Sequence, residues 1–171
     1  IDPDFVCVGA PPMPYAFGEG NYAKYIVRPI APLPGPPMDP AKPYGAGNPD
    51  YLRDDLKERL LAGEARFAFY VQLRTNPEKM PLDEATVRWE ESDSEPVHVA
   101  TLTIPKQNID EPGQQEYGEN LSFNTWRVLP EHTPAGSISL ARKVAYEASA
   151  ELRRHRNGIP AVEPVNPRTT P

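Results

Sequence analysis

Proline content is the feature that most constrains this chain, which carries 23 prolines in 171 residues. Proline lacks a backbone N–H donor and clashes with a preceding helical turn, so it is confined to helix starts, strand edges and turns. Eight prolines fall within residues 29–49, which excludes a helix or a central strand there. This segment is predicted to be an extended, polyproline-like strap. A plain helical bundle is therefore excluded.

Charge and composition exclude several classes of function. The chain has 18 Lys and Arg against 24 Asp and Glu, and its net charge of −6 argues against nucleic acid and anionic membranes as main partners. No apolar run approaches the roughly 20 residues of a transmembrane helix, so we expect no integral membrane segment. Because the chain has a single cysteine, we expect the reducing cytoplasm as its location. The single cysteine, Cys7, excludes an internal disulfide, and three scattered histidines leave no His-rich metal centre.

Four segments are predicted to be strands. Residues 15–17 and 22–27 flank residues 18–21, whose two glycines suit a hairpin turn. Residues 66–74 alternate between a large apolar face and a smaller mixed face, as in the wall of a barrel or sandwich. Residues 97–104 are rich in β-branched side chains. The chain is therefore expected to contain an antiparallel sheet.

Two helices are predicted. Asn48 is expected to cap the first helix, which carries Pro49 at its first position and ends at Gly63. Its buried stripe is expected to be three leucines at i, i+4 and i+8, namely Leu52, Leu56 and Leu60. The second helix is expected over residues 137–156, where nothing interrupts a helical composition before Gly158.

The remaining segments are expected to be irregular and to be held by aromatic side chains. Residues 75–96 form an acidic loop, with Trp89 as its expected anchor. Residues 106–136 show no clear helical or strand pattern, and Phe123 and Trp126 are their expected anchors.

The second predicted helix carries the best candidate site. Arg142, Tyr146 and Arg153 fall at about 0°, 40° and 20° around a helix, a single narrow stripe. A phenol has an ordinary pKa of about 10, so an adjacent fixed positive charge is the usual means of stabilising its anion. A phenolate is a known axial ligand of ferric haem. From spacing alone the alternative stays open that Tyr146 packs while both arginines only solvate the surface.

The segment from Arg142 to Tyr146 resembles the Arg-x-x-x-Tyr proximal motif of the haem catalases, including the alanine before the tyrosine. The resemblance implies that Tyr146 is the axial ligand of haem b iron and that Arg142 hydrogen-bonds and stabilises its phenolate. Arg153 falls where that family places an arginine on a haem propionate. Tyr146 and Arg142 would then be the catalytic residues, and all three would bind the cofactor.

The similarity extends over roughly residues 12–157. Residues 66–74 look like the penultimate strand of the catalase barrel, and residues 15–29 look like the preceding hairpin. Trp89, the acidic loop and residues 97–105 look like the approach to the last strand. Residues 129–138 resemble the short bacterial catalase-related haem proteins. The implied fold class is α+β, the C-terminal half of a catalase-like antiparallel β-barrel with a proximal haem-binding helix and long Pro-rich connections. We expect a haem domain over residues 1–157 and a Pro-rich tail over residues 158–171.

Two departures from the catalase pattern bear on function. Large catalases carry a histidine one turn after the proximal tyrosine, where this chain has Ala150. The distal histidine and asparagine of the family precede the region that the resemblance covers, and four strands cannot close an eight-stranded barrel. We therefore expect a partner, an N-terminal fragment or chain that carries the distal residues. Because catalase-like proteins are generally oligomers, the resemblance also implies a homo-oligomeric assembly.

The resemblance implies an enzyme that reacts with hydrogen peroxide or with organic hydroperoxides, since some relatives among the short bacterial proteins act on fatty-acid hydroperoxides. One alternative is a non-enzymatic haem-binding or structural subunit of a split catalase-like protein. Another is a Pro-rich binding module, in which residues 29–49 dock into an aromatic groove.

Overall fold

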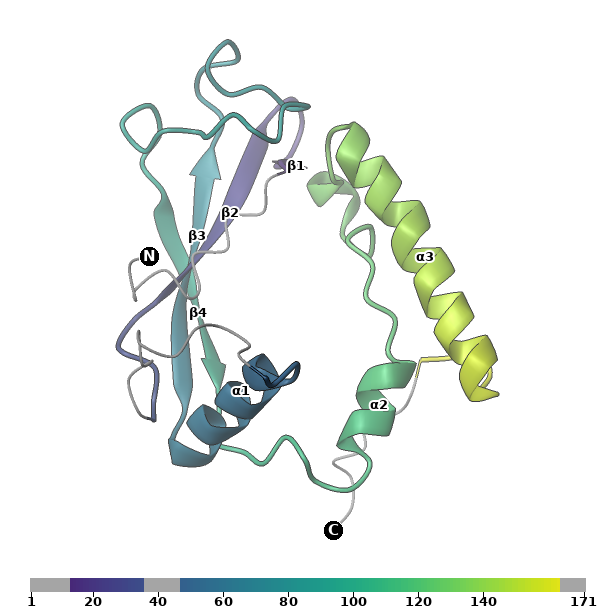
Figure 1. Ribbon diagram of the computed structural model, residues 1–171. Helices are drawn as coiled ribbons and strands as arrows, with labels where there is room; N and C mark the ends of the chain where they lie inside the picture. The colour runs from purple at the N-terminus through teal and green to yellow at the C-terminus, as the bar shows by residue number, and fades with distance from the viewer. Residues whose placement is uncertain (1–12, 36–46, 164–171) are drawn as a thin grey trace.

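The computed structural model describes residues 13–35 and 47–163, so the predictions for Cys7, for residues 36–46 of the strap and for residues 164–171 of the tail lie outside the described residues. The elements are β1 (Tyr15–Ala16), β2 (Tyr22–Pro29), α1 (Tyr51–Ala62), β3 (Ala65–Leu73), β4 (Val97–Ile104), α2 (Gln114–Asn120), a 3₁₀ helix η2 (Pro130–His132) and α3 (Ser137–Asn157). Figure 1 shows the sheet and α3 on opposite sides of the molecule, with α2 near the end of α3. The fold is a mixed α and β structure.

The sheet is an antiparallel meander in the order β1-β2-β3-β4. Tyr25 pairs with Val71 between β2 and β3, and the β3–β4 register shifts between Phe69 and Tyr70. All four predicted strands are confirmed, as is the turn between β1 and β2, where Gly18 adopts a positive φ of 78°. Within the described part of the chain no ladder joins β1 to β4, so the sheet stays open.

The strand β3 forms the centre of the sheet because its side chains alternate between two covered faces. On one face Phe67 packs with Leu60 of α1 and with the partly buried Val27 and Ile104. These apolar contacts remove side chains of both elements from water, which is the main favourable term in folding. The described part of the strap lies beside α1, where the Arg59 guanidinium donates to the Pro34 carbonyl at 3.3 Å.

The acidic loop between β3 and β4 covers the other face of the sheet, and Trp89 is its anchor, as predicted. The Trp89 side chain is 3% exposed, and the Lys24 ammonium lies 4.7 Å from the centre of its ring. The Gln72 side-chain amide donates to the Ser94 carbonyl at 2.9 Å. Burial lowers the pKa of Lys24. The loop is thus tied to the sheet by buried polar contacts as well as by an aromatic ring.

The start and the buried face of α1 differ from the prediction. Asn48 does not cap the helix: its side-chain oxygen accepts the Asp50 N–H at 2.9 Å, and Asp50 takes the N-cap position, so Pro49 lies outside the helix. Of the three leucines only Leu60 is buried, because only the last turn of α1 reaches the sheet; Leu52 and Leu56 are 66% and 46% exposed. A periodic stripe marks a helix, but it does not fix how much of that stripe is covered.

The prediction of an irregular segment over residues 106–136 is wrong in part, because it contains α2 and η2. Helix α2 is only seven residues long, contains Gly118 and buries none of its residues, so its sequence carries little helical signal. Trp126 is a half-buried anchor whose indole N–H donates to the Ser139 carbonyl at 2.9 Å. Phe123 is 68% exposed and is not an anchor.

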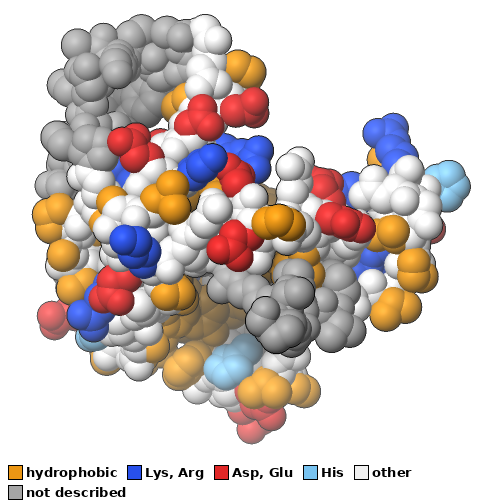
Figure 2. Space-filling view, turned by 90° about the horizontal axis from the view of Figure 1, so that it is seen from below, with side chains coloured by type: hydrophobic (Ala, Val, Ile, Leu, Met, Phe, Trp, Pro, Cys, Tyr) orange, Lys and Arg blue, Asp and Glu red, His pale blue; other side chains and the backbone are white. Residues whose placement is uncertain are grey.

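The strand β4 forms an exposed edge of the sheet. All of its residues except Ile104 are exposed, and they include the apolar Val97, Val99 and Leu102. Hydrophobic side chains are also visible in a hollow on the face of the molecule shown in Figure 2. A monomeric protein usually protects such an edge with charge, proline or a covering segment. No helix in the described ranges is long and apolar enough to cross a membrane.

Candidate functional site

The helix α3 carries the candidate residues, and its length is close to the prediction. It ends where Gly158 adopts the left-handed conformation, with φ 65°, and donates its N–H to the carbonyls of Arg154 and His155. This C-terminal geometry favours glycine because it has no Cβ. The last turn is basic, which complements the negative end of the helix dipole.

The first turn of α3 is positioned by a residue from the acidic loop. One Asp83 carboxylate oxygen accepts the backbone N–H of Ser137 at 2.6 Å and its hydroxyl at 2.7 Å. These hydrogen bonds lower the pKa of Asp83. A carboxylate at a helix N-terminus satisfies a free N–H and complements the positive end of the dipole. Asp83 therefore fixes where α3 begins relative to the sheet.

We expect Asp83→Ala to lower the thermal unfolding midpoint of the full chain at pH 7 and to flatten its dependence on acidic pH. Because the pKa of Asp83 is below its ordinary value of 3.8 in the folded chain, its contribution is complete above that value and is lost as the pH falls through the lowered pKa. Circular dichroism at a series of pH values measures both effects. The matched control is Glu84→Ala, which removes a neighbouring exposed carboxylate. Equal midpoints for the two variants would contradict the capping role.

Tyr146 and Arg142 lie together on α3, as the spacing predicts. The Tyr146 side chain is exposed (38%), and the Arg142 guanidinium carbon lies 5.6 Å from the centre of its ring. No residue in the described ranges forms a hydrogen bond with the phenol oxygen. The guanidinium therefore lies over the ring, close enough for a favourable cation–π contact.

Arg153 is directed to other partners. Its guanidinium donates to the Leu121 carbonyl at 2.7 Å and to the Glu119 carbonyl at 3.2 Å, at the end of α2. A longer contact of 3.5 Å reaches the Ser149 hydroxyl. Three of the five N–H donors of the guanidinium are thus engaged within the chain.

The neighbouring Arg154 belongs to a network that the sequence does not indicate. Its guanidinium lies 3.0 Å from the Glu163 carboxylate, which also accepts from Arg127 at 2.8 Å and from the Ser122 N–H at 3.1 Å. Chiefly because of the Ser122 N–H, with further contributions from the two arginines, the pKa of Glu163 falls to about 2. These residues are far apart in the sequence and form no motif, so no local signal could have identified them.

An exposed apolar strip of α3 lies beside Arg142. Ile138 and Leu152 are 39% and 50% exposed, and helical geometry places them at about 40° and 80° from Arg142, on the side away from Tyr146. The small residues Ala145 and Ser149 lie on the same side of the helix, at about 60° and 20° from Arg142. A flat ligand that lies across Arg142 can therefore contact this strip as well as the Tyr146 ring.

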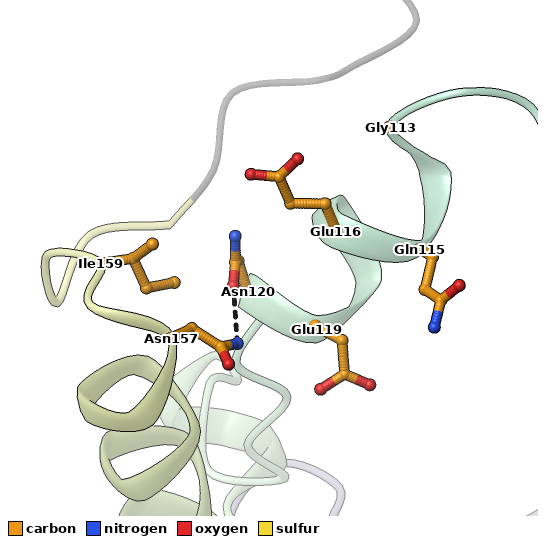
Figure 3. Close-up of a pocket in the computed structure, with 7 residues that line it drawn as sticks. All are labelled: Gly113, Gln115, Glu116, Glu119, Asn120, Asn157 and Ile159. Carbon is orange, nitrogen blue, oxygen red and sulfur yellow. Dashed lines mark hydrogen bonds between the residues drawn. The ribbon is translucent and has the colours of Figure 1, made fainter.

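A separate shallow pocket of about 480 Å³ lies between α2 and the end of α3. Figure 3 shows Asn120 and Asn157 joined by a hydrogen bond there, with their side-chain atoms 3.4 Å apart. Glu116 and Glu119 also line the pocket, whereas Arg142 and Tyr146 do not. In the described part of the chain no group of three or more His, Cys, Asp or Glu side chains could hold a metal ion. The candidate site is therefore the exposed stripe on α3, and the pocket is distinct from it.

Comparison with known proteins identifies the architecture. The crystal structure of a fungal catalase matches with a TM-score of 0.63 and 19% sequence identity, over 85% of this chain and 30% of that protein. The fold is catalase-like. The chain spans less than a third of that catalase, and at this identity the likeness concerns the fold alone. No protein-family model and no curated protein matches the sequence.

Proposed function

We propose that this chain is the proximal half of a catalase-related haem b enzyme that reacts with hydrogen peroxide or with an organic hydroperoxide such as that of a fatty acid. The observation that carries the proposal is the Tyr146 phenol, exposed beside the Arg142 guanidinium on a helix of a catalase-like fold. The haem domain would comprise residues 1–157 and the Pro-rich tail residues 158–171.

The residues of α3 fit a haem group in two respects and depart from it in one. The phenol oxygen is a suitable ligand for ferric iron, and the exposed apolar side chains of Ile138 and Leu152 offer a surface for a porphyrin on the neighbouring strip of the helix. The guanidinium of Arg142 supplies a fixed positive charge beside the ring. Arg153, by contrast, has only part of its donors available for a propionate.

The side chains would divide the work of binding. Tyr146 would lose its phenol proton to solvent and present the phenolate oxygen to the iron, while the charge of Arg142 would stabilise that anion. The Arg153 guanidinium would pair with a carboxylate. The bound haem would supply the redox chemistry of peroxide cleavage. Apolar neighbours such as Ile138 and Leu152 would exclude water from one edge of the ligand.

A partner would complete the assembly. The open four-stranded sheet, the uncovered β4 edge and the 30% coverage of the fungal catalase support a separate N-terminal segment that carries the distal histidine and asparagine. The free N–H and C=O groups of an edge strand offer a template for a further strand. We also propose that the assembly is a homo-oligomer in the cytoplasm.

The test is visible absorption spectroscopy of the full chain after addition of hemin. The unmodified chain is expected to show an intense Soret band with high-spin ferric tyrosinate features, and Tyr146→Phe is expected to lose the phenolate-to-iron charge-transfer band. Tyr70→Phe is the matched control, because the Arg28 guanidinium lies 5.1 Å from the Tyr70 ring in a similar pair on the sheet. An unchanged spectrum in Tyr146→Phe would show that another residue binds the iron.

The removal of Arg142 is expected to weaken hemin binding without abolishing it. Residues that orient or stabilise a metal ligand typically contribute about 10–100-fold to affinity, and we expect Arg142→Met to raise the hemin dissociation constant by this factor. Titration followed at the Soret band measures it. Lys143→Met is the control: the Lys143 ammonium lies 5.0 Å from the centre of the Trp126 ring. The proposal predicts little change for that variant.

The non-enzymatic alternative differs from the proposed enzyme in predicting haem binding without consumption of peroxide. If the chain only binds haem, its complex with the N-terminal segment would show the tyrosinate spectrum but would not consume peroxide. If the chain belongs to an enzyme, the complex would consume hydrogen peroxide or a fatty-acid hydroperoxide, and Tyr146→Phe would abolish this consumption.

A further inference from the structure

The end of α2 is held by two consecutive arginines of α3. Arg153 donates to the carbonyls of Glu119 and Leu121, and Arg154 donates to the Asn120 carbonyl between them at 3.2 Å. The last carbonyls of a helix have no partner within the helix, and cations there complement its dipole. Three consecutive carbonyls thus depend on two adjacent guanidinium groups.

Little else in the described structure stabilises α2. It has seven residues, none of them buried, and no side chain caps its N-terminus. Gly118 lies inside it, and glycine lowers helix stability. Isolated helices of this length are not stable in water, so the arginines of α3 are expected to decide whether α2 forms.

The two arginines differ in their freedom to leave α2. Arg154 is also paired with Glu163, and its side chain is 11% exposed. Arg153 has no carboxylate partner in the described ranges, and its partners on α2 are neutral carbonyls. Around the helix axis, Arg153 lies about 20° from Arg142, on the stripe that contains Tyr146. Arg154 lies about 120° from Arg142, away from that stripe.

We propose that Arg153 is shared between the end of α2 and a carboxylate of the ligand bound at Tyr146, so that ligand binding loosens the last turn of α2. This inference rests on the proposed function. A hydrogen bond from a guanidinium to a carboxylate is stronger than one to a neutral carbonyl, so the ligand displaces α2 from Arg153. By linkage, the factor by which ligand binding destabilises the last turn of α2 equals the factor by which a formed last turn lowers the affinity for the ligand.

Hydrogen exchange of residues 114–121 in the full chain tests the inference, with hemin and with hemin dimethyl ester, which lacks the carboxylates. Hemin is expected to accelerate exchange of these amides about tenfold, the effect of losing roughly 1.4 kcal/mol of hydrogen bonding, while the ester leaves the exchange unchanged. In Arg153→Met the amides are expected to exchange fast already and to show no further response to hemin. Arg154→Met, the matched control, is expected to exchange faster than the unmodified chain and still to respond to hemin.

The outcomes separate the inference from the function on which it rests. If hemin produces the tyrosinate spectrum but leaves the exchange of α2 unchanged, the inference is wrong and the proposed function stands. An equal acceleration by the dimethyl ester would also overturn it, since the effect would not depend on carboxylates. If hemin does not bind at all, both proposals fail.

Discussion

Gly136→Ala is expected to be among the most destabilising single substitutions in the described chain. Gly136 precedes the first turn of α3 with φ 88° and ψ 159°, a conformation essentially restricted to glycine. An added Cβ would lie 2.6 Å from the Met13 side chain and 2.8 Å from the Leu82 carbonyl oxygen. The Met13 side chain can move, but the backbone of Leu82 cannot move without displacing the acidic loop. We expect a loss of about 1–3 kcal/mol from backbone strain and a further ~1–3 kcal/mol from the clash.

The matched control for this prediction is Gly18→Ala. Gly18 also has a positive φ, 78°, but an added Cβ would meet nothing within 4 Å. It should therefore cost only about 1–2 kcal/mol of backbone strain. Urea unfolding of the full chain, followed by circular dichroism, gives both free energies of unfolding. If the two variants lose the same stability, the close packing of the acidic loop against the start of α3 is not supported.

Trp89→Ala is expected to cost about 3–5 kcal/mol of stability, the usual effect of removing a large buried aromatic side chain. Trp89 is 3% exposed, and its indole N–H donates to the Pro81 carbonyl at 3.4 Å. Its ring also contacts the ammonium of Lys24, a residue that is 6% exposed. Because small domains are stable by only about 5–15 kcal/mol, this loss would remove a large share of the free energy of unfolding.

Trp126→Ala is the comparison that isolates burial. Trp126 also carries a lysine ammonium over its ring and donates its indole N–H to a carbonyl, but it is only half-buried. We expect a smaller loss of about 1–2 kcal/mol. Urea unfolding followed by circular dichroism avoids the loss of the tryptophan fluorescence signal. A loss for Trp126→Ala equal to that for Trp89→Ala would show that Trp89 does not anchor the loop to the sheet.

The sequence by itself determined the elements whose signals are local. The alternation of β3, the β-branched residues of β4 and the hairpin turn at Gly18 predicted the sheet correctly. The uninterrupted composition before Gly158 predicted α3. These features depend on interactions between residues that are close in the chain, so the local order of residues is enough to specify them. The same helical periodicity placed Arg142 beside Tyr146.

Only the tertiary structure decided how these elements are held and where the charged side chains point. Asp83 and Ser137 are 54 residues apart in sequence, and Arg153 is more than 30 residues from the carbonyls that it holds at the end of α2. The leucine stripe of α1 is covered only at Leu60, since only that end of the helix reaches the sheet. A residue pattern specifies a helix or a strand through its nearest neighbours in the chain. Contacts between distant segments form only after the chain has folded, so no local pattern records them.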